Sequence, residues 1–147
     1  MKHFFAVLII AFAGVMTHAQ YGTNEIPAFH PARPAPAQKL PAILTEKQLA
    51  EQGLILPAQK ESYKAAARAS AIVYQVPCYC YCDRNHGHTS LRSCFEGTHG
   101  ANCGTCMQEA LYSYRQSKKG WSAKQIRDGI ERGDFKMIDL QNVAPVQ

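Results

Sequence analysis

The sequence predicts a mostly α-helical fold: one small helical domain that includes an irregular segment rich in cysteine and histidine. Two segments, starting at Thr45 and at Ser122, fit a capping box, in which a hydroxyl and a glutamine three residues later satisfy unpaired backbone amides. Alanine and long, flexible side chains are abundant between residues 59 and 74, and these residues favour helix. No alternating apolar run is long enough to indicate a strand.

The N-terminus has the layout of a signal peptide. Lys2 precedes an apolar run from Phe4 to Ala13, and the small residue Ala19 offers a cleavage point. The apolar run is shorter than the ~20 residues that cross a bilayer, so we expect membrane contact only before cleavage. Residues 1–19 are therefore expected to direct export to the periplasm or the medium. A retained anchor helix is the alternative.

A proline- and alanine-rich stretch follows over residues 20–41, and its composition resists both helix and sheet. We expect it to be an extended linker, in which His30 has no particular role. The helical Cys/His-rich domain is then expected over residues 42–133, with a C-terminal tail over residues 134–147.

Four helices are expected in this domain. The first follows Thr45 and ends at Gly53. The second has Pro57 in its first turn and continues to Tyr74. We expect its inner stripe to carry Tyr63, Ala67, Ala71 and Tyr74.

The other two expected helices follow the cysteines. One runs from Met107 to about Lys118, and the last begins at the Ser122 capping box and stops at Gly133. The last helix carries Ile126 and Ile130 on its inner face.

The charge of the chain is mildly basic, with a formal value of +5 that becomes +4 when the leader containing Lys2 is removed. Lysine and arginine are scattered and are not interleaved with aromatic residues, so the pattern indicates no nucleic-acid surface.

The densest chemical signal lies between residues 78 and 106, which contain all six cysteines and three histidines. The candidate metal ligands are Cys78, Cys80, Cys82, His86, His88, Cys94, His99, Cys103 and Cys106. In an extended segment alternate side chains share a face, so the first three cysteines would present converging sulfurs. The last two are expected at a helix N-terminus, where the helix dipole favours the thiolate.

These ligands favour a soft metal ion. Copper is the first candidate, because sulfur matches copper(I) and imidazole binds copper in both oxidation states. Zinc is the second, with four ligands drawn from Cys82, Cys94, Cys103 and Cys106. The expected partners are the ion itself and a metal-delivery or redox protein. Attached haem is excluded because Met107, and not a histidine, follows Cys106.

Two alternatives remain open. In an exported chain six cysteines often form a disulfide framework, with fifteen possible connectivities. Such a stapled domain would serve as an adaptor through the basic helix face near Arg115, Lys118 and Lys119. In the other alternative Cys103 and Cys106 form a thiol-disulfide redox pair, resolved by one of the earlier cysteines.

The run from Pro77 to Cys82, together with the later Cys103 and Cys106, resembles bacterial exported proteins known by a PCYCGC or CYCXC signature. The resemblance extends over roughly residues 40–132, and Tyr81 stands where the PCYCGC version has glycine. Some CYCXC relatives are described as selenoproteins, which implies redox or soft-metal chemistry at the sulfur positions. No cysteine follows the leader, in contrast to the lipoprotein members.

Overall fold

The computed structural model describes residues 25–147, and within that range it contains helices and loops but no strand. The mostly helical fold predicted from the sequence is confirmed. The expected signal peptide at 1–19, and the first residues of the expected linker, lie outside the described residues. The elements are α1 (Glu46–Ala50), α2 (Pro57–Arg68), α3 (Ser70–Val73), α4 (Cys82–His86), η1 (Leu91–Phe95), η2 (His99–Asn102), α5 (Gly104–Lys118), α6 (Ala123–Glu131) and η3 (Asp134–Met137), where η marks a 3-10 helix.

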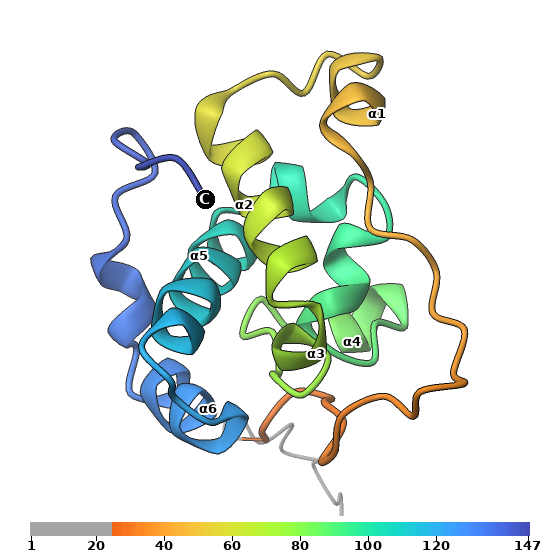
Figure 1. Ribbon diagram of the computed structural model, residues 1–147, viewed down its shortest axis with the longest axis vertical. Coiled ribbons are helices and arrows are strands. Elements are labelled where there is room, and N and C mark those ends of the chain that lie inside the picture. Colours follow the sequence, from red (N-terminus) through yellow and green to blue (C-terminus); the bar gives the residue numbers. More distant parts are fainter. Residues whose placement is uncertain (1–24) are drawn as a thin grey trace, which may run out of the picture.

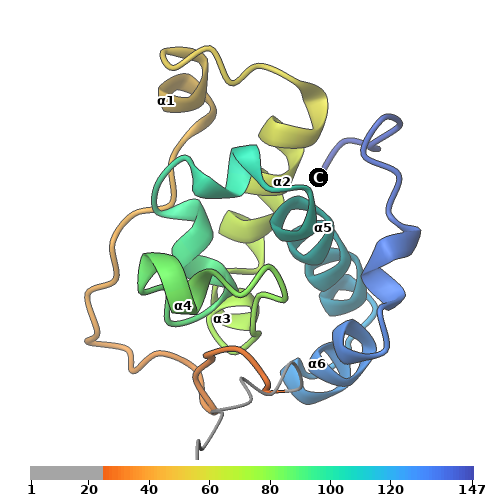
Figure 2. The same ribbon diagram turned by 180° about the vertical axis from the view of Figure 1, so that it is seen from behind.

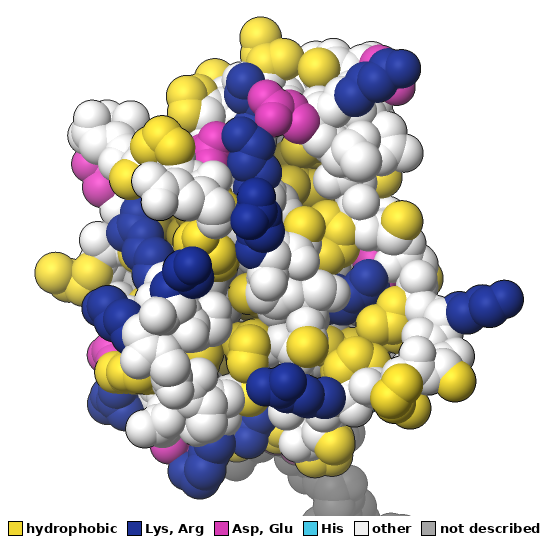
Figure 3. Space-filling model, in the orientation of Figure 1, with side chains coloured by type: hydrophobic (Ala, Val, Ile, Leu, Met, Phe, Trp, Pro, Cys, Tyr) yellow, Lys and Arg dark blue, Asp and Glu magenta, His cyan; other side chains and the backbone are white. Residues whose placement is uncertain are grey.

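Both predicted capping boxes are present. The Thr45 hydroxyl accepts the Gln48 amide at 3.3 Å, and the Ser122 hydroxyl accepts the Gln125 amide at 3.3 Å. Ion pairs also hold α1 against α2, because Glu46 lies 3.1 Å from the Lys60 ammonium. Basic side chains form a short column along α2 on the face shown in Figure 3. The short first helix thus gains stability from its cap and from α2.

Helices α2 and α5 lie side by side at the centre of the molecule, and α6 packs against α5 (Figure 1). The α2 face in this contact is built from small residues, including Ala65 and Ala66, which are fully buried. Ile126 and Ile130 of α6 are also buried, as the sequence predicts. Seen from behind, α4 and the neighbouring short helices lie in front of α2 and α3 (Figure 2).

The expected second helix is interrupted near its end. Ala69 has φ −104° and ψ 28°, so the chain leaves helical geometry between α2 and α3. The Ser70 hydroxyl beyond the break accepts a hydrogen bond from Arg92 at 3.0 Å, which ties α3 to the cysteine-rich segment. The predicted inner stripe is also wrong at Ala67, which is exposed. Because alanines occur on every face of this helix, composition alone does not identify the buried side.

Residues 25–41 have no helix, as their composition predicts, but they pack on the domain. Pro27 is fully buried, and the His30 ring stacks on Tyr74 with centroids 3.8 Å apart. The Pro41 carbonyl accepts a hydrogen bond from Arg92 at 2.7 Å. His30 therefore has a packing role that the composition of the stretch did not indicate.

The C-terminal segment also returns to the domain. Phe135 in η3 is buried, and the Val146 amide donates to the Glu61 carboxylate at 2.6 Å. The end of the described chain is thereby held beside α2. Within residues 25–147, no helix has both the length and the apolar character needed to span a membrane.

The close approach of η2 to η1 depends on Gly100. A Cβ at this position would lie 2.9 Å from the Cys94 carbonyl oxygen and 2.9 Å from the Phe95 ring. We expect Gly100→Ala to lower the free energy of unfolding by about 1–3 kcal/mol in urea titrations, because the loop must shift. Gly97→Ala is the matched control, since nothing lies within 4 Å of a Cβ there. Equal effects of the two substitutions would show that the close approach carries no such constraint.

Candidate metal centre

A tight turn brings the first three cysteines together. The Tyr81 amide donates to the Cys78 carbonyl at 3.0 Å, and Tyr81 itself has left-handed geometry, with φ 57° and ψ 33°. Helix α4 then begins at Cys82. The expected extended segment is therefore wrong, because the chain turns between Cys78 and Cys82. The prediction that their sulfurs converge is nevertheless confirmed, since these atoms and that of Cys80 lie within 4.8 Å of one another.

The start of α5 supplies the next two cysteines, as the sequence predicts. Cys103 is the N-cap, and its sulfur accepts the backbone amide of Cys106 at 3.3 Å. The helix begins at Gly104, three residues before the expected Met107. Unpaired amides at this end of a fifteen-residue helix favour negative charge on nearby sulfur.

The remaining ligands come from the segment between α4 and α5. Cys94 lies in η1 and is fully buried, and His99 is the first residue of η2. Tyr63 of α2 anchors this segment, because its hydroxyl donates to the Gly97 carbonyl at 2.5 Å and accepts the Ala101 amide at 3.2 Å. Burial is the main reason that the pKa of Tyr63 rises to about 12, so this anchor stays uncharged.

The six sulfurs are free thiols that lie in contact with one another. The Cys78 sulfur is 3.4 Å from that of Cys80 and 3.4 Å from that of Cys106, and the Cys82 and Cys94 sulfurs are 3.3 Å apart. A disulfide bond measures about 2.05 Å. Two sulfurs bound tetrahedrally to one zinc ion lie ~3.75 Å apart, as follows from a Zn–S distance of about 2.3 Å. The observed distances between sulfurs are much closer to the distance expected around a shared ion than to the length of a disulfide bond.

The ligand atoms fall into two groups of four in which all members lie within 4.8 Å of one another. The first, here called the Cys80 set, consists of Cys80, His99, Cys103 and Cys106. The second, here called the Cys94 set, consists of Cys82, His88, Cys94 and His99. Each set matches the number and type of ligands in a tetrahedral site, so the cluster could hold a metal ion.

His86 is the predicted ligand that the structure places differently. It is exposed at the end of α4, and no group of mutually close ligand atoms among the described residues includes it. Its ring centroid nevertheless lies 4.7 Å from that of His99. The two histidines of the His-Gly-His motif thus have different positions. The Nδ1 atom of His88 lies 3.3 Å from the Cys94 sulfur, whereas His86 lies outside the cluster.

Hydrogen bonds within the cluster lower the pKa of two thiols, Cys80 and Cys82, the latter mainly through its hydrogen bond with Cys78. Hydrogen bonds with Cys103 and Cys106 lower the pKa of Cys80 well below its usual value. At Cys103 the hydrogen bond with Cys106 acts to lower the pKa, but the hydrogen bond with Cys80 and burial outweigh it and raise the pKa to about 11. Burial, followed by the charges of the neighbouring histidines, lowers the pKa of His88. A thiolate and a neutral imidazole are the forms that bind metals.

Glu109 is a residue of the site that the sequence analysis did not single out. It lies on α5 three residues after Cys106, is fully buried, and accepts the Tyr79 amide at 2.9 Å. Its other carboxyl oxygen has no hydrogen-bond partner among the described residues. Burial raises its pKa to about 8, although hydrogen bonds from the Tyr79 amide and the Cys78 thiol oppose this rise. The signal was present, since a glutamate at this spacing shares the helix face of a buried cysteine.

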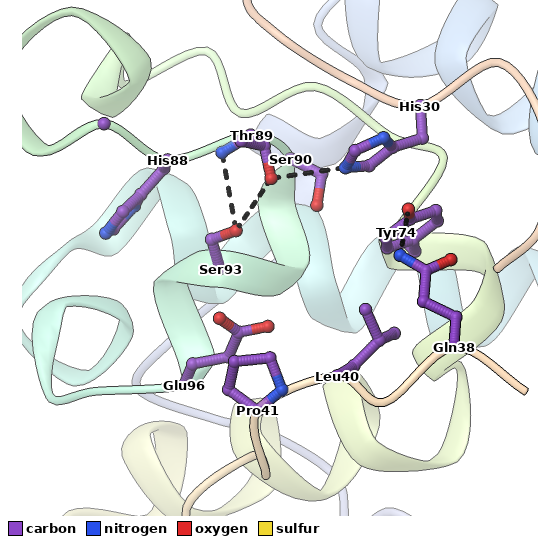
Figure 4. A pocket seen from close by; sticks show the side chains of 11 residues that line it. His30, Gln38, Leu40, Pro41, Tyr74, His88, Thr89, Ser90, Ser93 and Glu96 are labelled. Atoms are coloured by element: carbon purple, nitrogen blue, oxygen red, sulfur yellow. Dashed lines mark hydrogen bonds between the residues drawn. The ribbon is translucent and has the colours of Figure 1, made fainter.

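The N-terminal segment covers one side of the cluster, and a cavity opens beside another. Pro27, Cys78 and Cys82 line a narrow hollow, so this segment covers two of the sulfurs, whereas Cys80 and Cys103 are only partly buried. A cavity of about 440 Å³ is lined by His30, Tyr74, Thr89 and His88, among others. Figure 4 shows it in close-up, with the His30 imidazole hydrogen-bonded to the Thr89 hydroxyl at 3.2 Å. Of the ligands, only His88 lines this cavity among the described residues.

Fold and site together define a small helical protein whose buried core includes four cysteines of a larger thiol cluster, with two partly buried imidazoles against it. The chain belongs to the family described as "Protein of unknown function with PCYCGC motif", which it matches over residues 32–136. The resemblance predicted from the run that starts at Pro77 is thereby confirmed. No curated protein and no solved structure matches the chain. Because the family carries no assigned function, the function must be argued from the site.

The family motif explains the strain at Tyr81. Its name places glycine where this chain has Tyr81, and glycine adopts positive φ at no steric cost. We expect Tyr81→Gly to keep the free energy of unfolding within about 1 kcal/mol, because relief of the left-handed strain offsets the lost contact with Arg84. Tyr81→Val is the comparison, since a β-branched residue tolerates this conformation poorly and should destabilise the domain clearly in urea titrations. Equal losses in both variants would contradict the backbone explanation.

The buried Glu109 predicts a dependence of stability on pH. Its pKa is about 8 in the folded chain and returns to its usual 4.5 on unfolding. The folded chain therefore holds the proton of Glu109 more tightly than the unfolded chain does. The contribution of this protonated carboxyl to the free energy of unfolding is full below about pH 4.5 and is lost as the pH rises through about 8. We expect Glu109→Gln to flatten this part of the profile in the reduced, metal-free protein, as measured by urea unfolding across the pH range. Parallel profiles for the two proteins would overturn the assignment.

Proposed function

We propose that this domain binds a soft metal ion through the Cys80 and Cys94 sets, with copper(I) as the first candidate and zinc as the second. We further propose, from the signal-peptide layout of residues 1–19, that it does so outside the cytoplasm. The observation that carries the metal proposal is the presence of four nitrogen or sulfur atoms within 4.8 Å of one another in each set.

The donor chemistry supports a soft ion. Six thiols dominate the site, and thiolates select copper(I) and zinc over hard cations such as calcium or magnesium. The lowered pKa of Cys80 provides one thiolate before any metal arrives, through its hydrogen bonds with Cys103 and Cys106. The N-terminal segment covers the sulfurs of Cys78 and Cys82. This cover limits their contact with water and with oxidants, which oxidise exposed thiolates.

The alternatives are less well supported by the geometry. A disulfide scaffold requires bonded pairs, whereas the six cysteines are free. A redox pair at Cys103 and Cys106 requires an attacking thiol with a low pKa, whereas the pKa of Cys103 is raised to about 11. Free cysteines are also ordinary small core residues. A purely structural core does not account for two imidazoles placed against the sulfurs, with His88 3.3 Å from Cys94 and His99 3.6 Å from Cys80.

The proposal is tested on the full chain, expressed with its leader and recovered in its exported form. We expect elemental analysis to find stoichiometric copper or zinc, and six free thiols after denaturation in chelator. Absence of metal together with absence of free thiols would favour the disulfide scaffold. Absence of metal with one reducible pair would favour the redox protein.

The histidines supply a matched pair of variants for this test. His88→Ala removes a ligand of the Cys94 set and should weaken metal affinity by at least tenfold to a hundredfold, the approximate loss that outer-shell changes already cause. His86→Ala alters the same short motif at an exposed position outside both sets, so the affinity should stay nearly unchanged. A competition titration against a chromophoric chelator measures both, and equal affinities would remove His88 from the site.

A further inference from the structure

The cluster contains more ligands than one ion can use. A tetrahedral ion takes four ligands, yet the Cys80 set and the Cys94 set overlap only at His99. An ion in the Cys80 set alone would leave Cys78, Cys82 and Cys94 as buried thiols, with His88 beside them and without a role. The arrangement therefore accounts for all its ligands only if both sets are filled.

The position of Cys78 links the two sets. Its sulfur lies 3.4 Å from Cys80 and 3.4 Å from Cys106 in one set, and within 4.8 Å of Cys82 and Cys94 in the other. Only 2% of this residue is exposed, so its sulfur faces protein on all sides. A thiolate sulfur has several lone pairs and can bind two metal ions at once, unlike the proton-bearing thiol.

The assignment of His99 leaves the Cys94 set one ligand short. Its Nε2 lies 3.6 Å from the Cys80 sulfur, which places this imidazole with the Cys80 set. The Cys94 set then keeps three ligands, Cys82, His88 and Cys94. Cys78 is the nearby sulfur that completes it as the fourth ligand. Its contacts with Cys80 and Cys106 also place it as a fifth ligand to an ion in the Cys80 set, a number that zinc can accept.

Charge balance supports the same conclusion. Sulfur ligands bind as thiolates, so filling the site releases protons and leaves negative charge in a buried place. Burying such charge is costly unless cations balance it. Two zinc ions offset four of the negative charges on six thiolates and two copper(I) ions offset two, in each case twice what one ion offsets. The N-terminus of α5 at Cys103 adds further positive potential.

We propose that the domain holds two adjacent metal ions, one in each set, joined through the sulfur of Cys78. This inference rests on the proposed metal-binding function and specifies its capacity and its bridging ligand. Cys103 differs from Cys78 in this respect, since it belongs to the Cys80 set and to no other group of close ligand atoms among the described residues.

The experiment titrates the reduced full chain with Zn²⁺ and with Co²⁺, because neither ion can bind all eight ligand atoms of the site at once, so the number of bound ions counts the sites. We expect two ions per chain by native mass spectrometry. The Co²⁺ electron paramagnetic resonance signal should rise with the first ion and fall with the second, because a shared thiolate couples the two spins. A parallel titration with copper(I) completes the experiment. One ion per chain would overturn the inference and leave the proposed function intact, whereas no binding of Zn²⁺, Co²⁺ or copper(I) would overturn both.

Two serine variants test the bridge itself. Cys78→Ser should abolish the spin coupling and lower the affinity for the second ion at least tenfold. Cys103→Ser is the matched control. It should lower the affinity of the Cys80 set for its ion, while the Cys94 set still binds one Co²⁺ ion. Circular dichroism of both variants shows whether each remains helical. Coupled spins in folded Cys78→Ser, or two uncoupled ions in the unmodified chain, would overturn the assignment of Cys78.

Discussion

The hydrogen bond from the Tyr79 amide to the Glu109 carboxyl joins two parts of the site that lie 30 residues apart in the chain. It fixes the turn of the first three cysteines against α5, one helical turn from Cys106. The sulfur contacts of Cys78 and Cys80 with Cys106 join the same turn and helix, and the amide of Tyr79 adds a backbone hydrogen bond to them. A neutral, buried carboxyl is well suited to the role, because it holds the amide without adding a second negative charge beside the thiolates. The positions of the remaining ligands then follow from the packing of η1 and η2 against α2.

The sequence predicted the regular parts of the fold well because those parts are determined locally. The capping boxes at Thr45 and Ser122 are satisfied by residues three positions away, so their signals are complete within a short window. The break at Ala69 was not predictable in this way. It coincides with a contact from Arg92, which lies 22 residues from Ser70 in the chain, and tertiary contacts of this kind override helix propensity.

The composition of the site was also predictable, but its geometry was not. The spacing of Cys78, Cys80 and Cys82 suggested converging sulfurs, which the structure shows, although through a turn. The turn needs positive φ at position 81. A glycine there would have indicated a turn, whereas tyrosine does not. For Glu109 the sequence signals conflict: its spacing from Cys106 places it on the face of a buried cysteine, but a glutamate within a helix is ordinarily solvent-exposed. The packed structure resolves the conflict, since Glu109 is buried beneath Tyr79.

The cluster occupies the place that leucine and valine side chains fill in other small domains. Cys78, Cys82, Cys94 and Cys106 belong to the same buried core as Tyr63 and Phe95. Thiols bury less apolar surface than larger side chains, and three of the seven buried residues of α2 are alanine, so the core gains modest stability from burial alone. A bound ion would add ligand bonds at the point where this packing is weakest. Because the same side chains serve as core and as ligands, metal affinity and folding stability are thermodynamically linked: whatever loosens the core also weakens the site, and release of the metal costs the domain part of its stability.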